Sequence, residues 1–180
     1  MMTIPIETIK QLREMTLASI SDCKQALEEA NGDLKLANEI LKKKGLEVAA
    51  KRAGRAANQG RVEAYIHLGN KIGVLVEVNS ETDFVAKNDE FIRFSKDVAM
   101  QIAATEPKYV TKEDVPKDDI SQLDEREKAD YFKANCLLSQ PFVKDAKMTI
   151  QDYLNNLIAR IGENIVVRRF CRFKLGEDEK

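Results

Sequence analysis

Three short runs of apolar residues at helical spacing open the chain. Within each run the apolar positions lie three or four residues apart or adjacent: Ile6, Ile9 and Leu12; Cys23, Ala26, Leu27 and Ala30; Leu36, Ala37, Ile40 and Leu41. This spacing collects apolar side chains on one side of a helix. Asn31-Gly32 can end the second helix in a left-handed conformation, and Asp33 can cap the third. The pattern predicts a three-helix module over residues 1–45, with a second helix that begins near Ser21 or Asp22 and a third that ends at Gly45.

The period changes from helical to alternating after residue 60. Apolar side chains alternate with polar ones at four positions: Val62, Ala64, Ile66 and Leu68. Such alternation is typical of a strand with one buried face. Gly69-Asn70 suits a tight hairpin turn because both residues tolerate positive φ. The more continuously apolar residues 72–78 then predict a second, better-buried strand.

Helical and strand patterns continue to the end of the chain. They predict helices from Asn88 to Pro107, from about Asp124 to Leu138 and from Thr149 to Gly162, and a last strand over residues 164–173. Strands that come early and late, with helices between them, do not suit a parallel sheet. We therefore expect an α+β protein: the three-helix module, a helical linker over residues 46–59, and a core over residues 60–175 in which a small antiparallel sheet packs with helices. The charged residues 176–180 are expected to be a disordered tail.

Positive charge is concentrated around the predicted linker. The basic residues are Lys42, Lys43, Lys44, Lys51, Arg52, Arg55 and Arg61, opposed there only by Glu47. A solvated helical linker and a surface for an anionic partner both explain this stretch. The net charge of the whole chain is −1, so the chain as a whole has no attraction to nucleic acid or to anionic lipid.

The sequence lacks the patterns that mark enzymes, metal sites and membrane spans. Cys23, Cys136 and Cys171 are far apart and His67 is the single histidine, so four zinc ligands do not cluster. There is no glycine-rich phosphate loop, no nucleophile elbow and no secretion signal. No apolar run approaches the roughly 20 residues that cross a bilayer. We expect a cytoplasmic protein that is not an enzyme, with free thiols, no cofactor, no metal and no membrane contact.

Six stretches resemble the elongation factor Ts family in their order and spacing. They are residues 12–16 (LREMT), 22–27 (DCKQAL), 49–55 (AAKRAGR), 77–87 (EVNSETDFVAK), 140–143 (QPFV) and 161–170 (IGENIVVRRF). Together they span nearly the whole chain. Two features depart from the family: residues 16–21 read TLASIS, where the family has Thr-Gly-Ala-Gly-Met-Met, and the segment before Gln140 is short. The loss of two glycines changes the backbone freedom of the first turn.

The resemblance implies a non-enzymatic guanine-nucleotide exchange factor whose partner is elongation factor Tu. Its core site would be Thr82, Asp83, Phe84 and Val85, with Phe84 as a wedge that disturbs the Mg²⁺ and phosphate site of the GTPase. Without the resemblance, Thr82 or Asp83 capping a turn and Phe84 filling this protein's own core would explain the same residues.

The resemblance also implies a UBA-like N-terminal module that docks on the partner, with Arg13 and Lys24 as the expected contacts. Because the core occurs once, the chain is similar to the short form of the family, in which two chains pair as a homodimer. The rival hypothesis is a nucleic-acid or ribosome-binding adaptor that uses the basic linker. Few aromatic residues interleave with the basic ones, so no stacking platform is evident and no direct nucleic-acid binding is expected.

Overall fold

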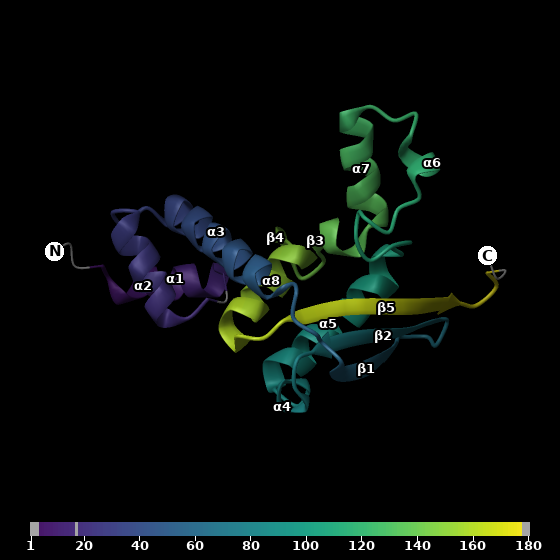
Figure 1. The fold of residues 1–180 in the computed structure, drawn as a ribbon, viewed down its shortest axis with the longest axis horizontal. Helices are drawn as coiled ribbons and strands as arrows, with labels where there is room; N and C mark the ends of the chain where they lie inside the picture. Colours follow the sequence, from purple (N-terminus) through teal and green to yellow (C-terminus); the bar gives the residue numbers. More distant parts are fainter. Residues whose placement is uncertain (1–3, 17, 178–180) are drawn as a thin grey trace. The chain divides into compact units, whose positions relative to one another are not determined.

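The structure is a computed structural model and describes residues 4–16 and 18–177 (Figure 1). The chain forms two compact units. One comprises Met1–Arg55 and Leu154–Asn164, and the other comprises Ala56–Tyr153 and Ile165–Lys180. The mixture of helices with a small antiparallel sheet confirms the predicted α+β class.

The first unit contains the predicted three helices, α1 (Ile6–Thr16), α2 (Ile20–Glu29) and α3 (Leu34–Arg52). Its core consists mostly of the predicted apolar positions: Leu12, Cys23, Ala26, Leu27, Ala30, Ala37 and Leu41. Leu36 is exposed instead. Asn31 and Gly32 have positive φ, and Asp33 caps α3. The predicted start of α2 is slightly too late, because the cap is Ser19, whose hydroxyl accepts a hydrogen bond from the Asp22 amide at 3.0 Å.

The predicted helix end at Gly45 is wrong. Helix α3 continues to Arg52, so Leu46–Arg52 belongs to the same helix and not to a separate element. Gly45 is buried within the helix, and a Cβ built on it would lie 3.6 Å from Asn156 Oδ1 of α8 (Ile150–Ile161) and 3.9 Å from Asn155 Cβ. Gly45 therefore lies where α3 packs against α8, and it does not break the helix. The division into a docking module over residues 1–45, a linker over 46–59 and a core stays a prediction.

Replacing Gly45 with alanine should raise the stability of the protein. A Cβ at this position would meet Asn156 at an ordinary van der Waals distance. Alanine inside a helix is more favourable than glycine by about 0.5–1 kcal/mol, so we expect a gain of that order in the free energy of unfolding. Urea unfolding followed by circular dichroism measures it. Gly54→Ala is the control, because Gly54 lies beyond α3 with nothing within 4 Å of a built Cβ; an equal gain there would contradict the helix-interior explanation.

The second unit is built on a three-stranded antiparallel sheet in the order β1-β2-β5, formed by β1 (Gln59–Ile66), β2 (Ile72–Ser80) and β5 (Ile165–Lys174). Helix α5 (Asp89–Thr105) contacts β1 and β2 and carries the largest fully buried side chains of this unit, Phe91 and Phe94. The short helix α4 (Asp83–Ala86) connects β2 to α5 and also contacts the sheet. The predicted strands, the hairpin turn and the helix that begins at Asn88 are confirmed, and Asn88 is the N-cap of that helix.

The remaining elements of this unit lie in the second half of the sequence. They are α6 (Lys117–Ile120), α7 (Glu125–Asn135), a 3₁₀ turn at Leu137–Ser139, and the hairpin of β3 (Pro141–Phe142) and β4 (Asp145–Thr149). Helix α8 begins in this unit and ends in the other. At the C-terminus, the Glu177 carboxylate pairs with Lys174 at 2.7 Å. Residues 178–180 lie outside the described residues, so a disordered tail stays a prediction.

The alternation in β1 predicts that its apolar side chains are buried, but in the structure they lie on the exposed face of the sheet. Val62 and Ile66 are exposed, whereas Glu63 is buried and pairs with Arg61 at 2.6 Å. The strand register places three cross-strand rows on the exposed face: Ile66, Gly73 and Phe173; Ala64, Leu75 and Cys171; Val62, Glu77 and Arg169. We call these nine residues the open sheet face. Apart from the ion pair of Glu77 with Arg169 at 2.7 Å, its side chains are uncharged.

Candidate functional site

The short helix α4 presents the predicted site residues on a well-anchored turn. Thr82 is its N-cap, and the Thr82 hydroxyl accepts from the Val85 amide at 3.4 Å. The hydroxyl of the fully buried Ser80 donates to the Thr82 carbonyl at 2.8 Å, which ties the turn to the end of β2. On the other side, the Asn88 amide donates to the Val85 carbonyl at 2.9 Å. Because Asn88 also caps α5, both ends of α4 are attached to regular structure.

Phe84 points away from the protein's own core. Its side chain is 80% exposed, although aromatic side chains of this size are normally among the more buried residues. The alternative in which Phe84 fills this protein's core is therefore wrong. The capping half of that alternative holds for Thr82, which does cap the turn. An exposed ring on an anchored turn is suited to insertion into an apolar site on another molecule.

A charged pair accompanies the exposed ring. The Lys87 ammonium lies 2.8 Å from Asp83 Oδ2 and 6.0 Å from the centre of the Phe84 ring. The hydrogen bond from Lys87, followed by its charge, lowers the pKa of Asp83. Asp83 is therefore ionised at neutral pH and its carboxylate already has a partner. Sequence reasoning did not single out Lys87, although acid-to-lysine spacing of four residues is a recognisable helical pair.

The predicted N-terminal contacts, Arg13 and Lys24, lie on the first unit and are both exposed. Lys24 is 3.8 Å from Glu28. Burial raises the pKa of Cys23, the neighbour of Lys24, and the nearby Arg13 charge acts in the opposite direction. The apolar residues Leu12 and Leu27 of the same two helices are buried in the module's own core, as the sequence predicts.

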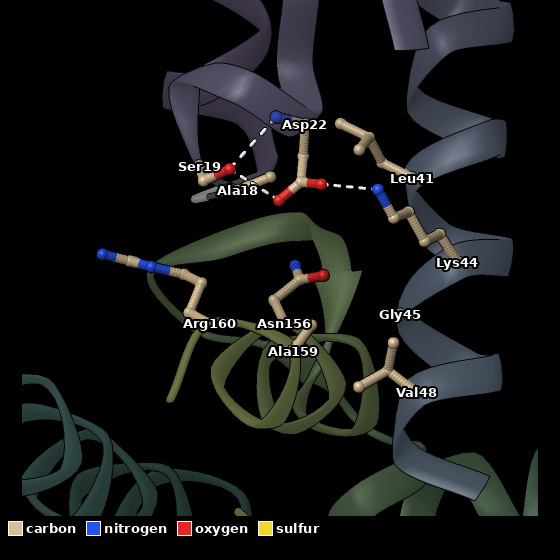
Figure 2. A pocket seen from close by; sticks show the side chains of 10 residues that line it. All are labelled: Ala18, Ser19, Asp22, Leu41, Lys44, Gly45, Val48, Asn156, Ala159 and Arg160. Atoms are coloured by element: carbon tan, nitrogen blue, oxygen red, sulfur yellow. Dashed lines mark hydrogen bonds and ion pairs between the residues drawn. The ribbon is translucent and has the colours of Figure 1, made fainter. Parts of the chain in front are cut away.

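The turn that departs from the family leads into α2 and borders a small pocket (Figure 2). The Ser19 hydroxyl donates to Asp22 Oδ2 at 2.6 Å, and Lys44 of α3 reaches Asp22 Oδ1 at 2.5 Å. The Lys44 hydrogen bond is the main cause of the lowered pKa of Asp22, and Ser19 adds to it. Asn156 of α8 donates to the Thr16 carbonyl at 2.8 Å. A serine in place of a family glycine thus caps α2 and joins a hydrogen-bonded network; Leu17 lies outside the described residues.

The single histidine and the three cysteines do not form a catalytic or metal site among the described residues. His67 is exposed, as the sequence predicts, and its Nδ1 lies 3.0 Å from the Tyr65 hydroxyl. Cys23 and Cys136 are buried, Cys171 is exposed on β5, and all three are free thiols. Among residues 4–16 and 18–177, no cluster of His, Cys, Asp or Glu could hold a metal ion. The helices in this part of the chain are also too short or too polar to cross a bilayer.

Comparison with known proteins decides the family. The family model described as "Elongation factor TS" matches residues 6–130 and 127–177. The chain belongs to the elongation factor Ts family. The elongation factor Ts of Carboxydothermus hydrogenoformans is 53% identical, with 97% of this chain and 90% of the relative covered. That of Caldanaerobacter subterraneus subsp. tengcongensis is 50% identical over 97% of this chain and 98% of the relative. That of Geobacter sulfurreducens is 49% identical over 98% of this chain and 91% of the relative.

Membership makes this protein a translation elongation factor that acts in protein biosynthesis. The family model matches in two stretches that meet at residues 127–130, which lie within α7. The alignment with the Carboxydothermus elongation factor Ts extends over 195 positions, more than the 180 residues of this chain. This chain therefore lacks residues that its relative has.

Proposed function

We propose that this protein is a guanine-nucleotide exchange factor that binds elongation factor Tu in its GDP form and promotes release of GDP during translation in the cytoplasm. The observation that carries the proposal is Phe84, an aromatic side chain 80% exposed on a turn anchored at both ends. Membership of the elongation factor Ts family supplies the partner. The protein transforms no substrate and needs no cofactor.

The mechanism follows from how a GTPase holds GDP. Backbone amides and a lysine surround the phosphates and Mg²⁺ bridges them, so several interactions depend on one arrangement of the supporting helices. A wedge that separates those helices by about an ångström weakens these interactions together. Phe84 acts as the wedge, Thr82 and Val85 hold it in the turn, and Asp83 acts through hydrogen bonds near the ligands of the metal.

Exchange requires that the factor discriminates between two states of its partner. It binds the nucleotide-free GTPase more tightly than the GDP form, and by reciprocity GDP weakens the binding of the factor by the same ratio. A factor with equal affinity for both states would shift nothing. The excess of GTP over GDP in the cell then sets the direction.

Release of a fluorescent GDP from elongation factor Tu, followed by stopped flow, tests the proposal. Substoichiometric factor should accelerate release of the whole GDP population, because each molecule acts repeatedly. Absence of acceleration with a cognate partner would contradict the exchange function. RNA binding that weakens steeply with salt would then favour the adaptor hypothesis. Against that hypothesis, two cations of the basic stretch are engaged within the first unit: Lys44 with Asp22, and Arg52 with the Gly162 carbonyl.

The N-terminal module contributes a second, weaker contact through Arg13 and Lys24. Reversing both charges, Arg13→Glu with Lys24→Glu, should lower the association rate with elongation factor Tu by about tenfold at low salt, with a smaller effect at high salt. Both side chains are exposed, so the fold should be retained. Stopped-flow binding measures the rate, and Lys10→Glu, a reversal at another exposed α1 position, is the control. An unchanged association rate at low salt would remove these two residues from the contact.

The working unit is a homodimer that pairs through the open sheet face. Four of its nine residues are exposed large apolar side chains: Val62, Ile66, Leu75 and Phe173. Apolar side chains gathered on one side of a sheet mark a surface that another molecule covers. A second copy of this chain is the occupant that fits, since a surface with little net charge can pack against itself without repulsion. Two such faces packed together form a closed dimer, in which neither face stays available to a third chain.

A further inference from the structure

Lys87 stands out because it touches both side chains to which the proposed mechanism gives a role. Its ammonium lies 2.8 Å from the Asp83 carboxylate and 6.0 Å from the Phe84 ring centre. It is the C-cap residue of α4, and its own amide donates to the Phe84 carbonyl at 3.2 Å. Lys87 is therefore bound to Asp83 and Phe84 through both its backbone and its side chain.

This pair does little for the stability of the protein. The side chains of Lys87 and Asp83 are 74% and 53% exposed, and exposed ion pairs of this kind contribute little to folding. Their order, an acid four residues before a lysine, is the favourable one for a helix. The pair can therefore set which way Asp83 and Phe84 point without being needed for the fold.

The partner's chemistry gives the pair a further role. The proposed target is the surroundings of a bound nucleoside diphosphate, which are rich in phosphate and metal-ligand oxygens. A lone carboxylate approaching such a site is repelled, whereas a carboxylate paired with an ammonium is not. The same ammonium flanks the Phe84 ring and restricts its conformations, so the ring loses less conformational entropy when it inserts.

We propose that Lys87 is a positioning residue for nucleotide exchange: it holds the Asp83 carboxylate beside the Phe84 ring, so that the wedge meets the GTPase preformed and close to neutral. This inference rests on the proposed exchange function and adds a residue to it. Lys87 acts before insertion, on the encounter of the two proteins. Its loss should therefore reduce the efficiency of exchange at low factor concentration more than the maximal rate at saturation.

The test compares Lys87→Met and Lys87→Arg with the wild type in GDP release from elongation factor Tu. Methionine keeps the length of the side chain and removes its charge, whereas arginine keeps the charge. We expect Lys87→Met to lower the slope of rate against factor concentration by roughly two- to fivefold, the range for a weak positioning contact, with the saturating rate nearly unchanged. Lys87→Arg should restore the slope. Lys128→Met is the matched control, since Lys128 pairs with Glu125 at 2.9 Å on another exposed helix.

Two further measurements separate positioning from a loss of charge alone. In an Asp83→Asn background, Lys87→Met should cause no further loss of slope, because the interaction is already absent. In the free protein, carbon NMR of the Asp83 carboxyl should give a higher pKa in Lys87→Met than in the wild type, since the lowering cation is gone. Circular dichroism confirms the fold of each variant.

The outcomes distinguish this inference from the proposed function. If the wild type accelerates GDP release and Lys87→Met keeps the wild-type slope, the inference fails and the exchange function stands. The inference also fails if Lys128→Met lowers the slope as much as Lys87→Met does. It fails too if Lys87→Met lowers the slope by the same factor in the Asp83→Asn background. If the wild type does not accelerate release, the exchange function and this inference fail together.

Discussion

Replacing Phe84 with alanine should reduce the acceleration of GDP release by at least roughly 30-fold, the effect of losing a buried aromatic anchor at an interface. In the free protein the ring is 80% exposed, so its removal opens no cavity. We therefore expect the free energy of unfolding to change by no more than about 0.5 kcal/mol, as for other surface substitutions. Stopped-flow release of fluorescent GDP measures the first effect, and urea unfolding the second.

The control for this result is Leu175→Ala, which removes another large apolar side chain with 76% exposure. It should leave exchange unchanged, because Leu175 lies outside α4. Full activity of Phe84→Ala would remove Phe84 as the wedge. Equal losses in both variants would point to a general effect of removing surface apolar groups.

Replacing Leu75 with lysine should convert the protein from a dimer to a monomer. Leu75 lies in the central strand of the open sheet face, between Ala64 and Cys171 in the register, and is 46% exposed in the single chain. Covering an unpaired ammonium in an apolar interface costs several kcal/mol, so the dissociation constant of the dimer should rise by at least roughly 100-fold.

Sedimentation equilibrium measures this effect, with the wild type expected at twice the chain mass of 20.4 kDa. Val143→Lys is the matched control, since Val143 has 47% exposure in the same unit but lies after β3, away from the sheet face. A wild type that is strictly monomeric at micromolar concentration would contradict the homodimer. A Leu75→Lys protein that remains a dimer would show that another surface pairs.

The local signals in the sequence predicted the elements well and their surroundings less well. Asp33, Thr149 and Asn88 cap helices as their residue types indicate, because a cap depends only on neighbours in sequence. Gly45 does not end α3, since its environment includes Asn155 and Asn156, far away along the chain. Helix propensity describes what glycine costs in a helix, and it contains nothing about packing against a second helix, which can keep the helix intact through a glycine.

The sidedness of β1 was mispredicted for a related reason. Alternation shows that a strand has two different faces, but not which face its own chain covers. Here α5 packs over the side that carries Glu63, and Arg61 at 2.6 Å compensates the buried carboxylate. The apolar side is left for another molecule under the homodimer proposal. Spacing alone likewise could not tell whether Phe84 was core or surface, whereas the pair of Asp83 and Lys87 could have been found from its four-residue separation.

The first unit is assembled from two stretches of chain that leave the ribosome at very different times. Residues up to Arg55 are synthesised early, but Leu154–Asn164 joins them only near the end, and the hydrogen bond from Asn156 to the Thr16 carbonyl spans 140 residues. At typical elongation rates this gap corresponds to a delay on the order of ten seconds. The first unit therefore lacks this segment while β1, β2 and α5 of the other unit are made. A factor that serves elongation would complete its own N-terminal unit only after residues 56–153 of the other unit have been made.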